Sequence, residues 1–189
     1  MVAATAAPDA ITEHKLANYT GRKIAIDAAN FIYQFLVAVR SANAAGMTSQ
    51  LTNDAGEVTS HLNGMFYRTI RLMTNGVKPV YVFDGKAPDM KGGELAKRRK
   101  AKKEASEKLK EAQKAGNTEE ANKYSRQTVS MKQSHIDDCI KLCRLLGVPC
   151  VKAAGEAEAQ CARLCAEGKV WAAASEDMDT LCFNSNILL

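Results

Sequence analysis

Acidic residues follow four short segments that each have the composition of a β-strand. The four stretches are KIAIDAAN, PVYVFDGK, AGEAEAQ and SEDMDT, and their six candidate metal ligands are Asp27, Asp84, Glu156, Glu158, Asp177 and Asp179. In an open parallel sheet the carboxyl ends of the strands meet at one crevice, where ligands bind. Six negative charges in one crevice repel one another unless cations lie between them. Because Mg²⁺ and Mn²⁺ prefer oxygen ligands, the pattern predicts a divalent-metal site.

The spacing within the acidic pairs supports this prediction. Glu156 and Glu158 can reach the same crevice from the first turn of a helix, and Asp177 and Asp179 point the same way in extended chain. A single aspartate after a strand is more often a helix N-cap or a turn residue. Six at four strand ends instead indicate two divalent ions about 4 Å apart, the arrangement that hydrolyses phosphodiesters.

The elements that must position these residues alternate between strand and helix. Period-2 and compact apolar runs predict strands at 23–28, 79–83, 148–152 and 170–174. Helical spacing predicts helices at 30–40, 62–73, 91–115 and 156–168, with another running to 146, and 41–57 is predicted to be a loop. This order predicts an α/β fold with a mainly parallel sheet flanked by helices and right-handed crossovers.

The positive charge of the chain is concentrated in one segment. Residues 91–114 hold ten Lys and Arg against four Glu, whereas the other residues hold 16 against 17 Asp and Glu. Such a run is often only a solvated helix. Its position directly after Asp84 favours a function, because a phosphate polymer approaches an acidic crevice only where cations offset the repulsion. We expect this polar helical excursion to project above the strand ends.

Other residue types give weaker indications. The six cysteines all lie between 139 and 182 and are expected to be reduced and buried in an intracellular protein, with a zinc site as the alternative. The histidines, at 14, 61 and 135, lie away from the acidic stretches, so no histidine is expected to act as a general base. No apolar run approaches the ~20 residues of a membrane helix, and the N-terminus lacks the pattern of a secretory signal.

Five blocks of sequence then resemble one family. GRKIAIDAANFIYQFL, TSHLNGMFYRTIRLM, KPVYVFDGKAPDMKGGELAKRR, GEAEAQCA and AAASEDMDTLCF occur in the order found in the eukaryotic flap endonucleases of the structure-specific 5′-nuclease superfamily. The resemblance runs from about residue 8 to residue 183. It implies a magnesium-dependent DNA endonuclease and 5′–3′ exonuclease of replication and repair, with a PIN-like core. Such an enzyme cuts 5′ flaps near single-strand/duplex junctions by a two-metal mechanism and leaves a 5′-phosphate.

The resemblance also implies roles for individual residues. The six carboxylates match the metal ligands of the family. Residues 88–131 match its helical arch, through or under which the 5′ strand passes. Lys91 and Arg98 match arch cations that stabilise the transition state. Tyr33 matches an aromatic residue that stacks on a base, although a tyrosine at this position could instead serve helix packing. Basic positions near the DNA path are matched by Arg40, Arg68 and Arg71.

Both ends of the sequence depart from the family pattern. The family begins Met-Gly-Ile before an apolar helix, whereas this sequence begins MVAATA and ends at Leu189. Family members continue with a further metal-binding aspartate, a duplex-binding helix–three-turn–helix element with a potassium ion, and a tail for the sliding clamp. We therefore expect residues 1–189 to form a single, incomplete nuclease domain with reduced cleavage and lost flap specificity.

Two other functions are consistent with parts of the sequence. One is a truncated, catalytically weak or inactive DNA-binding remnant of such a nuclease. The other is a sugar-nucleotide transferase that binds Mn²⁺ through Asp177-Met178-Asp179, but this explains neither the basic segment nor the other four carboxylates. By family resemblance the expected partner is branched DNA with a 5′ flap. The expected compartment is the nucleus, with a mitochondrial fraction as a second expectation, and no membrane is expected.

Overall fold

Four parallel strands form the sheet at the centre of the molecule. The computed structural model describes residues 8–44, 59–86 and 92–189. The strands are β1 (Lys23–Asp27), β2 (Lys78–Phe83), β3 (Cys150–Lys152) and β4 (Ala172–Ala174), in the order β3-β2-β1-β4. All three strand pairs are parallel. The predicted α/β fold with a mainly parallel sheet is confirmed.

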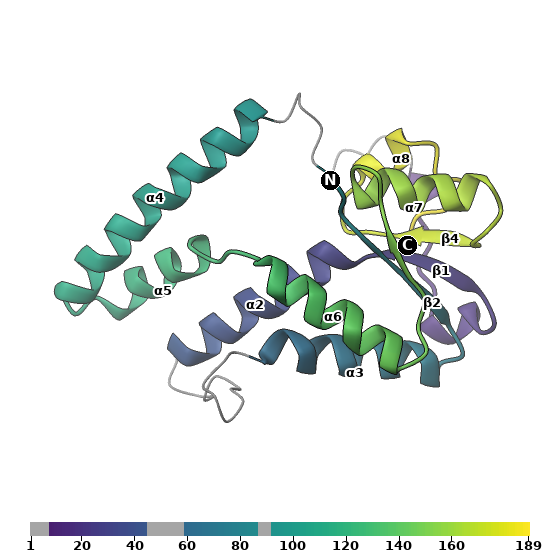
Figure 1. Cartoon of the computed structure of the whole chain (residues 1–189), viewed down its shortest axis with the longest axis horizontal. Coiled ribbons are helices and arrows are strands. Elements are labelled where there is room, and N and C mark those ends of the chain that lie inside the picture. Colours follow the sequence, from purple (N-terminus) through teal and green to yellow (C-terminus); the bar gives the residue numbers. More distant parts are fainter. Residues whose placement is uncertain (1–7, 45–58, 87–91) are drawn as a thin grey trace.

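Helices connect the strands and cover both faces of the sheet (Figure 1). Two short 3₁₀ turns, η1 (Pro8–Ala10) and η2 (Leu16–Tyr19), precede β1. The α-helices are α2 (Ala28–Ala44), α3 (Ser60–Thr74), α4 (Gly92–Lys114), α5 (Thr118–Gln127), α6 (Gln133–Leu145), α7 (Ala157–Ala166) and α8 (Asp179–Cys182).

Strand alternation divides the core between the two faces. Successive side chains of a strand point to opposite faces. Ile24 and Ile26 therefore pack with α2, α3 and α6 residues in one buried cluster, while Ala25 packs with α7 residues in the other. The same alternation brings Asp27 to the α7 face. The two cysteine pairs lie in different clusters, with Cys139 and Cys143 on the α6 side, so the zinc alternative that joined them is wrong.

The strand order places a topological switch beside β1. The chain moves outward from β1 to β2 and β3, and α7 then returns it to β4 on the other side of β1. In such sheets the ligand crevice lies at the carboxyl ends of the two strands where the order reverses. Here those ends belong to β1 and β4, which carry Asp27 and the SEDMD loop.

Helices α4 and α5 project from the body as an antiparallel pair (Figure 1). Gly116, at φ 69°, ends the first helix in the left-handed conformation that glycine tolerates best, and the side chain of Asn117 caps the second. Ala105 and Ala112 are buried where the two helices meet, and Lys108 lies over the ring of Tyr124. The excursion therefore has a small apolar face, which the charge pattern concealed.

Other boundaries differ from the sequence predictions. Helix α2 continues to Ala44 instead of ending at 40, and α5 and α6 are separate helices where one long helix was expected. Strands β3 and β4 are shorter than predicted because only Cys150–Lys152 and Ala172–Ala174 pair with their neighbours. None of the helices in the described parts of the chain has the length and apolar character that crossing a membrane requires.

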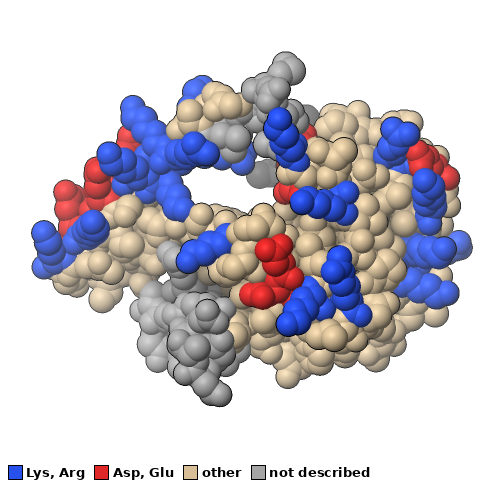
Figure 2. All heavy atoms as spheres, viewed as in Figure 1, with Lys and Arg blue, Asp and Glu red and all other residues tan. Residues whose placement is uncertain are grey.

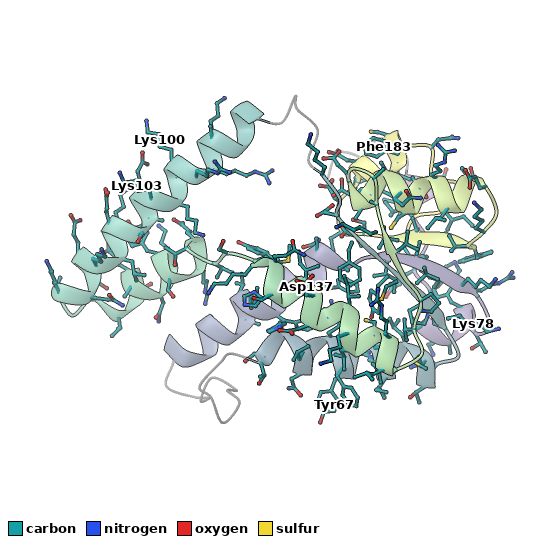
Figure 3. All side chains as sticks on the ribbon, viewed as in Figure 1. Tyr67, Lys78, Lys100, Lys103, Asp137 and Phe183 are labelled. Atoms are coloured by element: carbon teal, nitrogen blue, oxygen red, sulfur yellow. The ribbon has the colours of Figure 1, made fainter. Side chains whose placement is uncertain are left out.

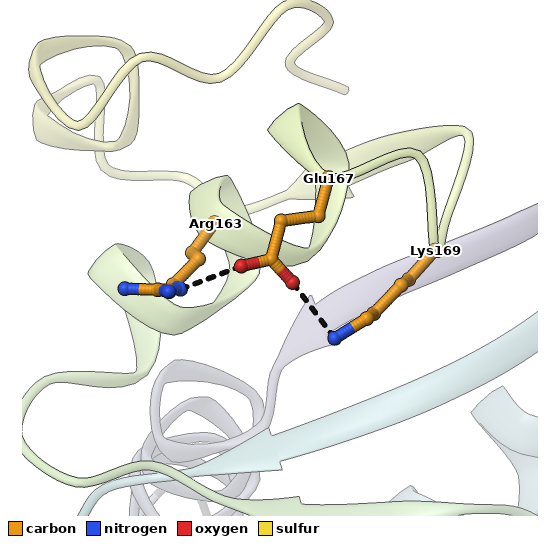
Figure 4. Close-up of polar contacts among 3 residues, drawn as sticks. All are labelled: Arg163, Glu167 and Lys169. Carbon is orange, nitrogen blue, oxygen red and sulfur yellow. Dashed lines mark hydrogen bonds and ion pairs between the residues drawn. The ribbon is translucent and has the colours of Figure 1, made fainter.

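Two ion pairs link the end of α7 to the turn that follows it (Figure 4). Glu167 accepts from Arg163 Nε at 2.8 Å through one carboxylate oxygen and pairs with Lys169 Nζ at 2.8 Å through the other. These hydrogen bonds, the one from Lys169 first, lower the pKa of Glu167. The network closes the turn from α7 into β4, although exposed pairs of this kind contribute little to stability.

His61 is a buried histidine without a hydrogen-bond partner. Its side chain on α3 is 1% exposed, neither ring nitrogen is hydrogen-bonded, and the His135 ring lies 4.7 Å away. Burial lowers the pKa of His61, with the His135 charge as a second cause, although Asp138 at 3.9 Å opposes them. The folded protein thus favours the neutral ring, so this group contributes full stability above about pH 6.5 and less as the pH falls.

We therefore expect His61→Leu to make the protein less sensitive to acid. The difference in melting temperature between this variant and the parent should widen in favour of the variant from pH 7.5 to pH 5.5. Thermal unfolding followed by circular dichroism measures it, with His14→Gln as the control because His14 is exposed. A constant difference across this pH range would contradict the role of His61.

Candidate acidic active site

One cavity at the carboxyl ends of the strands is lined by all six predicted carboxylates. Its volume is about 540 Å³. The lining residues are Asp27, Ala29, Asn30, Tyr33, Asp84, Arg98, Met131, Glu156, Glu158, Asp177 and Asp179. Four segments that are distant in the sequence thus converge where parallel strands end.

Asp27 and Asp84 lie at the ends of the two central strands. Asp27 is the last residue of β1, is only 6% exposed, and accepts a hydrogen bond from the Ala29 amide at 2.9 Å. Asp84 follows β2 and accepts one from the Ala157 amide at 2.9 Å. Because Ala157 begins α7, Asp84 also fixes the start of that helix.

A close backbone contact holds the segment with Glu156 and Glu158 against the end of β2. The Gly85 amide donates to the Gly155 carbonyl at 2.7 Å, and the Ala153 amide donates to the Phe83 carbonyl at 2.8 Å. Glu156 is the N-cap residue of α7 and Glu158 lies in its first turn. This is the geometry that the spacing of the two glutamates predicted.

Local hydrogen bonds shape the SEDMD loop. The Asp179 amide donates to Asp177 Oδ1 at 3.0 Å, and the buried Thr180 hydroxyl donates to the Asp177 carbonyl at 3.0 Å. Ser175 Oγ accepts from the Asp177 amide at 3.1 Å. The backbone turn keeps both aspartates on the cavity wall.

Burial has a marked effect on the ionisation of Asp27. Burial raises the pKa of Asp27 from 3.8 to about 6, and the charges of Asp84 and Asp177 contribute to the same increase. The hydrogen bonds from the amides of Ala29 and Asn30 oppose it. Burial and the neighbouring carboxylates thus disfavour the ionised form of Asp27.

The donor set fits hard divalent cations. All six predicted ligands offer carboxylate oxygens, the ligand type that Mg²⁺ and Mn²⁺ select. Within residues 8–44, 59–86 and 92–189, no three acidic, cysteine or histidine side chains meet at metal-ligand distances. Uncompensated carboxylates repel one another, so we expect cations to draw these side chains together.

Two further predicted site residues also line the cavity. Tyr33, on α2, is partly exposed there, and Arg98 reaches it from α4. In Figure 2 an opening separates α4 from the body, and Lys and Arg side chains of α4 lie along it. The structure therefore places a cation and an aromatic ring in the same cavity as the carboxylates.

The other predicted basic residues lie elsewhere or cannot be placed. Arg68 packs over the Phe31 ring at 4.2 Å and donates to Gln34 at 3.2 Å, so it joins α3 to α2. Arg71 is exposed near the end of α3 and does not line the cavity. Arg40 belongs to α2, but its side chain is outside the described part, as is the whole of Lys91.

Sequence reasoning missed Asn30 and Met131 as cavity residues. Asn30 stands one helical turn after Asp27, so its position next to the first carboxylate was a usable signal. Met131 lies between α5 and α6, in a segment expected to be helical, and no pattern in the sequence marked it.

Comparison with known families explains this arrangement. The XPG N-terminal domain matches residues 2–105, which include Asp27 and Asp84, and the XPG I-region matches residues 147–189, which include the other four carboxylates. This chain belongs to the XPG family. Both matched regions contribute carboxylates to the cavity, and α5 and α6 lie between them in the sequence.

Relatives of this XPG-family chain include flap endonucleases. The chain is 57% identical to flap endonuclease 1 of Neurospora crassa over 183 residues, which are 97% of this chain and 45% of the relative. It therefore spans about half the length of this curated relative. The sequence resemblance to the flap endonucleases is confirmed.

Solved structures share the fold. Flap endonuclease-1 from Methanococcus jannaschii matches 94% of this chain and 55% of its own, with 37% identity and a TM-score of 0.65. The catalytic core of Rad2 in complex with DNA substrate matches 98% of this chain and 48% of its own, with 25% identity and a TM-score of 0.64.

Proposed function

We propose that this chain is a divalent-metal nuclease that hydrolyses DNA phosphodiesters at 5′ flaps. One observation carries the proposal: six carboxylates line a single cavity together with Arg98 and Tyr33, beside the basic helix α4. Acidic oxygens suit metal ions, the guanidinium suits a phosphate and the exposed ring suits an unstacked base. The relatives named flap endonuclease support the same substrate class.

The chain's own residues have separate tasks in this reaction. The six carboxylates would hold Mg²⁺ or Mn²⁺, as two ions in the proposed arrangement. Bound metal would supply an activated water and stabilise negative charge on the phosphate. Arg98 holds the scissile phosphate against the cavity, and Tyr33 stacks on the adjoining unpaired base. The remaining α4 cations offset the repulsion between DNA and the acidic wall.

Cleavage of a labelled 5′-flap duplex tests the proposal. We expect cutting at the junction with Mg²⁺, none with chelator, and at least about 10²-fold slower cutting by Asp179→Asn. Asp137→Asn is the matched control, since Asp137 lies on the exposed side of α6 (Figure 3). Cutting that survives chelation, or an unaffected Asp179→Asn, would contradict the metal assignment.

A DNA-binding protein without catalysis is the second candidate function. The chain aligns with less than half of its Neurospora crassa relative, so catalysis by the whole relative does not by itself extend to it. In the same assay this candidate predicts retention of flap DNA on a gel without product, whatever the metal.

Arg98 and Lys103 offer a direct test of the α4 contribution. Arg98 lines the cavity, whereas Lys103 projects from the outer side of α4 (Figure 3). We expect Arg98→Ala to slow single-turnover cleavage by about 10²-fold, the usual effect of losing a group that stabilises transition-state charge. Lys103→Ala should weaken DNA binding only slightly and leave the single-turnover rate unchanged. Equal effects of the two substitutions would show that α4 acts only through its total charge.

A further inference from the structure

Three thiols gather where α6 meets the edge strand of the described sheet. Cys139 and Cys143, one turn apart on α6, are fully buried in the larger core cluster. Cys150, in β3, is half-buried and packs against the same cluster. None of the three lines the acidic cavity, so the proposed nuclease reaction does not use them.

Cys143 and Cys150 both make hydrogen bonds with the backbone of Val148. The Val148 amide donates to the Cys143 carbonyl at 2.9 Å, and the Cys150 thiol donates to the Val148 carbonyl at 3.7 Å. Gly147, at φ 71°, makes the sharp turn that allows this return. A tight turn therefore returns the half-buried Cys150 to the same core cluster as the fully buried Cys143.

The environment gives the two thiols opposite character. The Cys143 thiol donates a hydrogen bond to the Cys150 sulfur, which is the main cause that lowers the pKa of Cys150, and the Arg144 charge also contributes. The same contact and burial raise the pKa of Cys143. Cys150 is the less buried of the two sulfurs, and its lowered pKa favours the thiolate there. Nucleophilic attack on an oxidant requires a thiolate.

We propose that Cys143 and Cys150 form an oxidisable dithiol that a hydroperoxide converts to a disulfide. The Cys150 thiolate attacks one oxygen of hydrogen peroxide, the O–O bond breaks, and one proton is taken up to give Cys150 sulfenic acid and water. The Cys143 sulfur then attacks the Cys150 sulfur and displaces a second water. Two thiols are oxidised to one disulfide while one peroxide is reduced.

Other cysteines in the described chain lack this arrangement. Cys161 and Cys165 are buried on the opposite face of the sheet, in the α7 cluster. Cys182 is exposed, so a peroxide can reach it, but it belongs to neither core cluster. Cys139 is the one competitor within the described α6–β3 junction, and burial raises its pKa to about 12.

Peptide mapping distinguishes Cys143 from Cys139 as the disulfide partner of Cys150. The folded full chain is treated with hydrogen peroxide, its remaining thiols are alkylated, and it is digested with trypsin without reduction. Cleavage after Lys141, Arg144 and Lys152 puts Cys143 in LCR, Cys150 in LLGVPCVK and Cys139 in a third peptide. We expect LCR joined to LLGVPCVK at the summed mass less two hydrogens, released by dithiothreitol.

Variants test the order of the two steps. With Cys143→Ala, Cys150 should stop at the sulfenic acid and be labelled by dimedone, while Cys182→Ser should leave the cross-link unchanged. A cross-link from Cys139 to Cys150, or oxidation of Cys182 with Cys150 left reduced, would overturn the proposal. The peptide map of the parent protein shows which cysteine is joined to Cys150 even if Cys143→Ala fails to fold. This result is independent of nuclease activity.

Discussion

Replacing Asp27 by asparagine is expected to stabilise the metal-free protein and to abolish its response to divalent ions. Burial and the neighbouring carboxylates raise the pKa of Asp27 from 3.8 to about 6. At neutral pH the folded state must therefore keep a charge that it disfavours, at a cost of about 3 kcal/mol. Asparagine removes the charge and keeps an oxygen that can accept from the Ala29 amide.

The pH dependence follows from the direction of the shift. A raised pKa means that the folded state binds the proton more tightly than the unfolded state does. The stability contributed by this group is full below about pH 4 and is lost as the pH rises to about 6 and above. In Asp27→Asn this loss should be absent, and the melting temperature of the metal-free protein at pH 7.5 should rise by roughly 5–10 °C.

Thermal unfolding with and without Mg²⁺ measures both effects. The parent protein should be stabilised by the ion through mass action, whereas Asp27→Asn should show little change and no cleavage of flap DNA. Asp137→Asn is the control, because that carboxylate is exposed on α6. If Asp27→Asn were less stable than the metal-free parent, the buried charge of Asp27 would not destabilise the folded state.

Substitution of Gly85 by alanine is expected to separate two walls of the cavity. A Cβ at this position would lie 2.0 Å from the Ala153 carbonyl oxygen and 2.8 Å from that of Ala154. Both contacts are with backbone, so a side-chain rotation cannot relieve them. The segment that carries Glu156 and Glu158 must move away from β2 and lose the hydrogen bond between Gly85 and Gly155.

Gly155, whose carbonyl accepts the hydrogen bond from the Gly85 amide, provides a matched control. Among the described residues, a Cβ there would meet only the Lys86 carbonyl oxygen, at an ordinary 3.9 Å. We expect Gly85→Ala to lower the free energy of unfolding by about 3 kcal/mol and to weaken Mg²⁺ binding at least tenfold. Gly155→Ala should change either quantity little.

Urea unfolding and a Mg²⁺ titration of each variant give the comparison. If Gly85→Ala and Gly155→Ala had equal stability and equal ion binding, the close contact at Gly85 would not position the glutamates.

Residues close in sequence determine much of the candidate site. The apolar run before Asp27 and the β-branched run before Asp84 define buried strands, and a parallel sheet brings their carboxyl ends together. The six carboxylates that line the cavity could therefore be named from local pattern alone. Local pattern did not separate α5 from α6, because the turn between 128 and 132 contains neither glycine nor proline.

The tertiary structure decided what local pattern leaves open. The pairing of β4 with β1, and not with β3, places the SEDMD loop beside Asp27, and no short-range signal specifies that neighbour. Arg68 and Arg98 look alike in sequence, yet one packs on the rings of α2 and the other reaches the cavity. Charge and periodicity are properties of a segment, whereas contact depends on how distant segments pack, and only the folded chain fixes that.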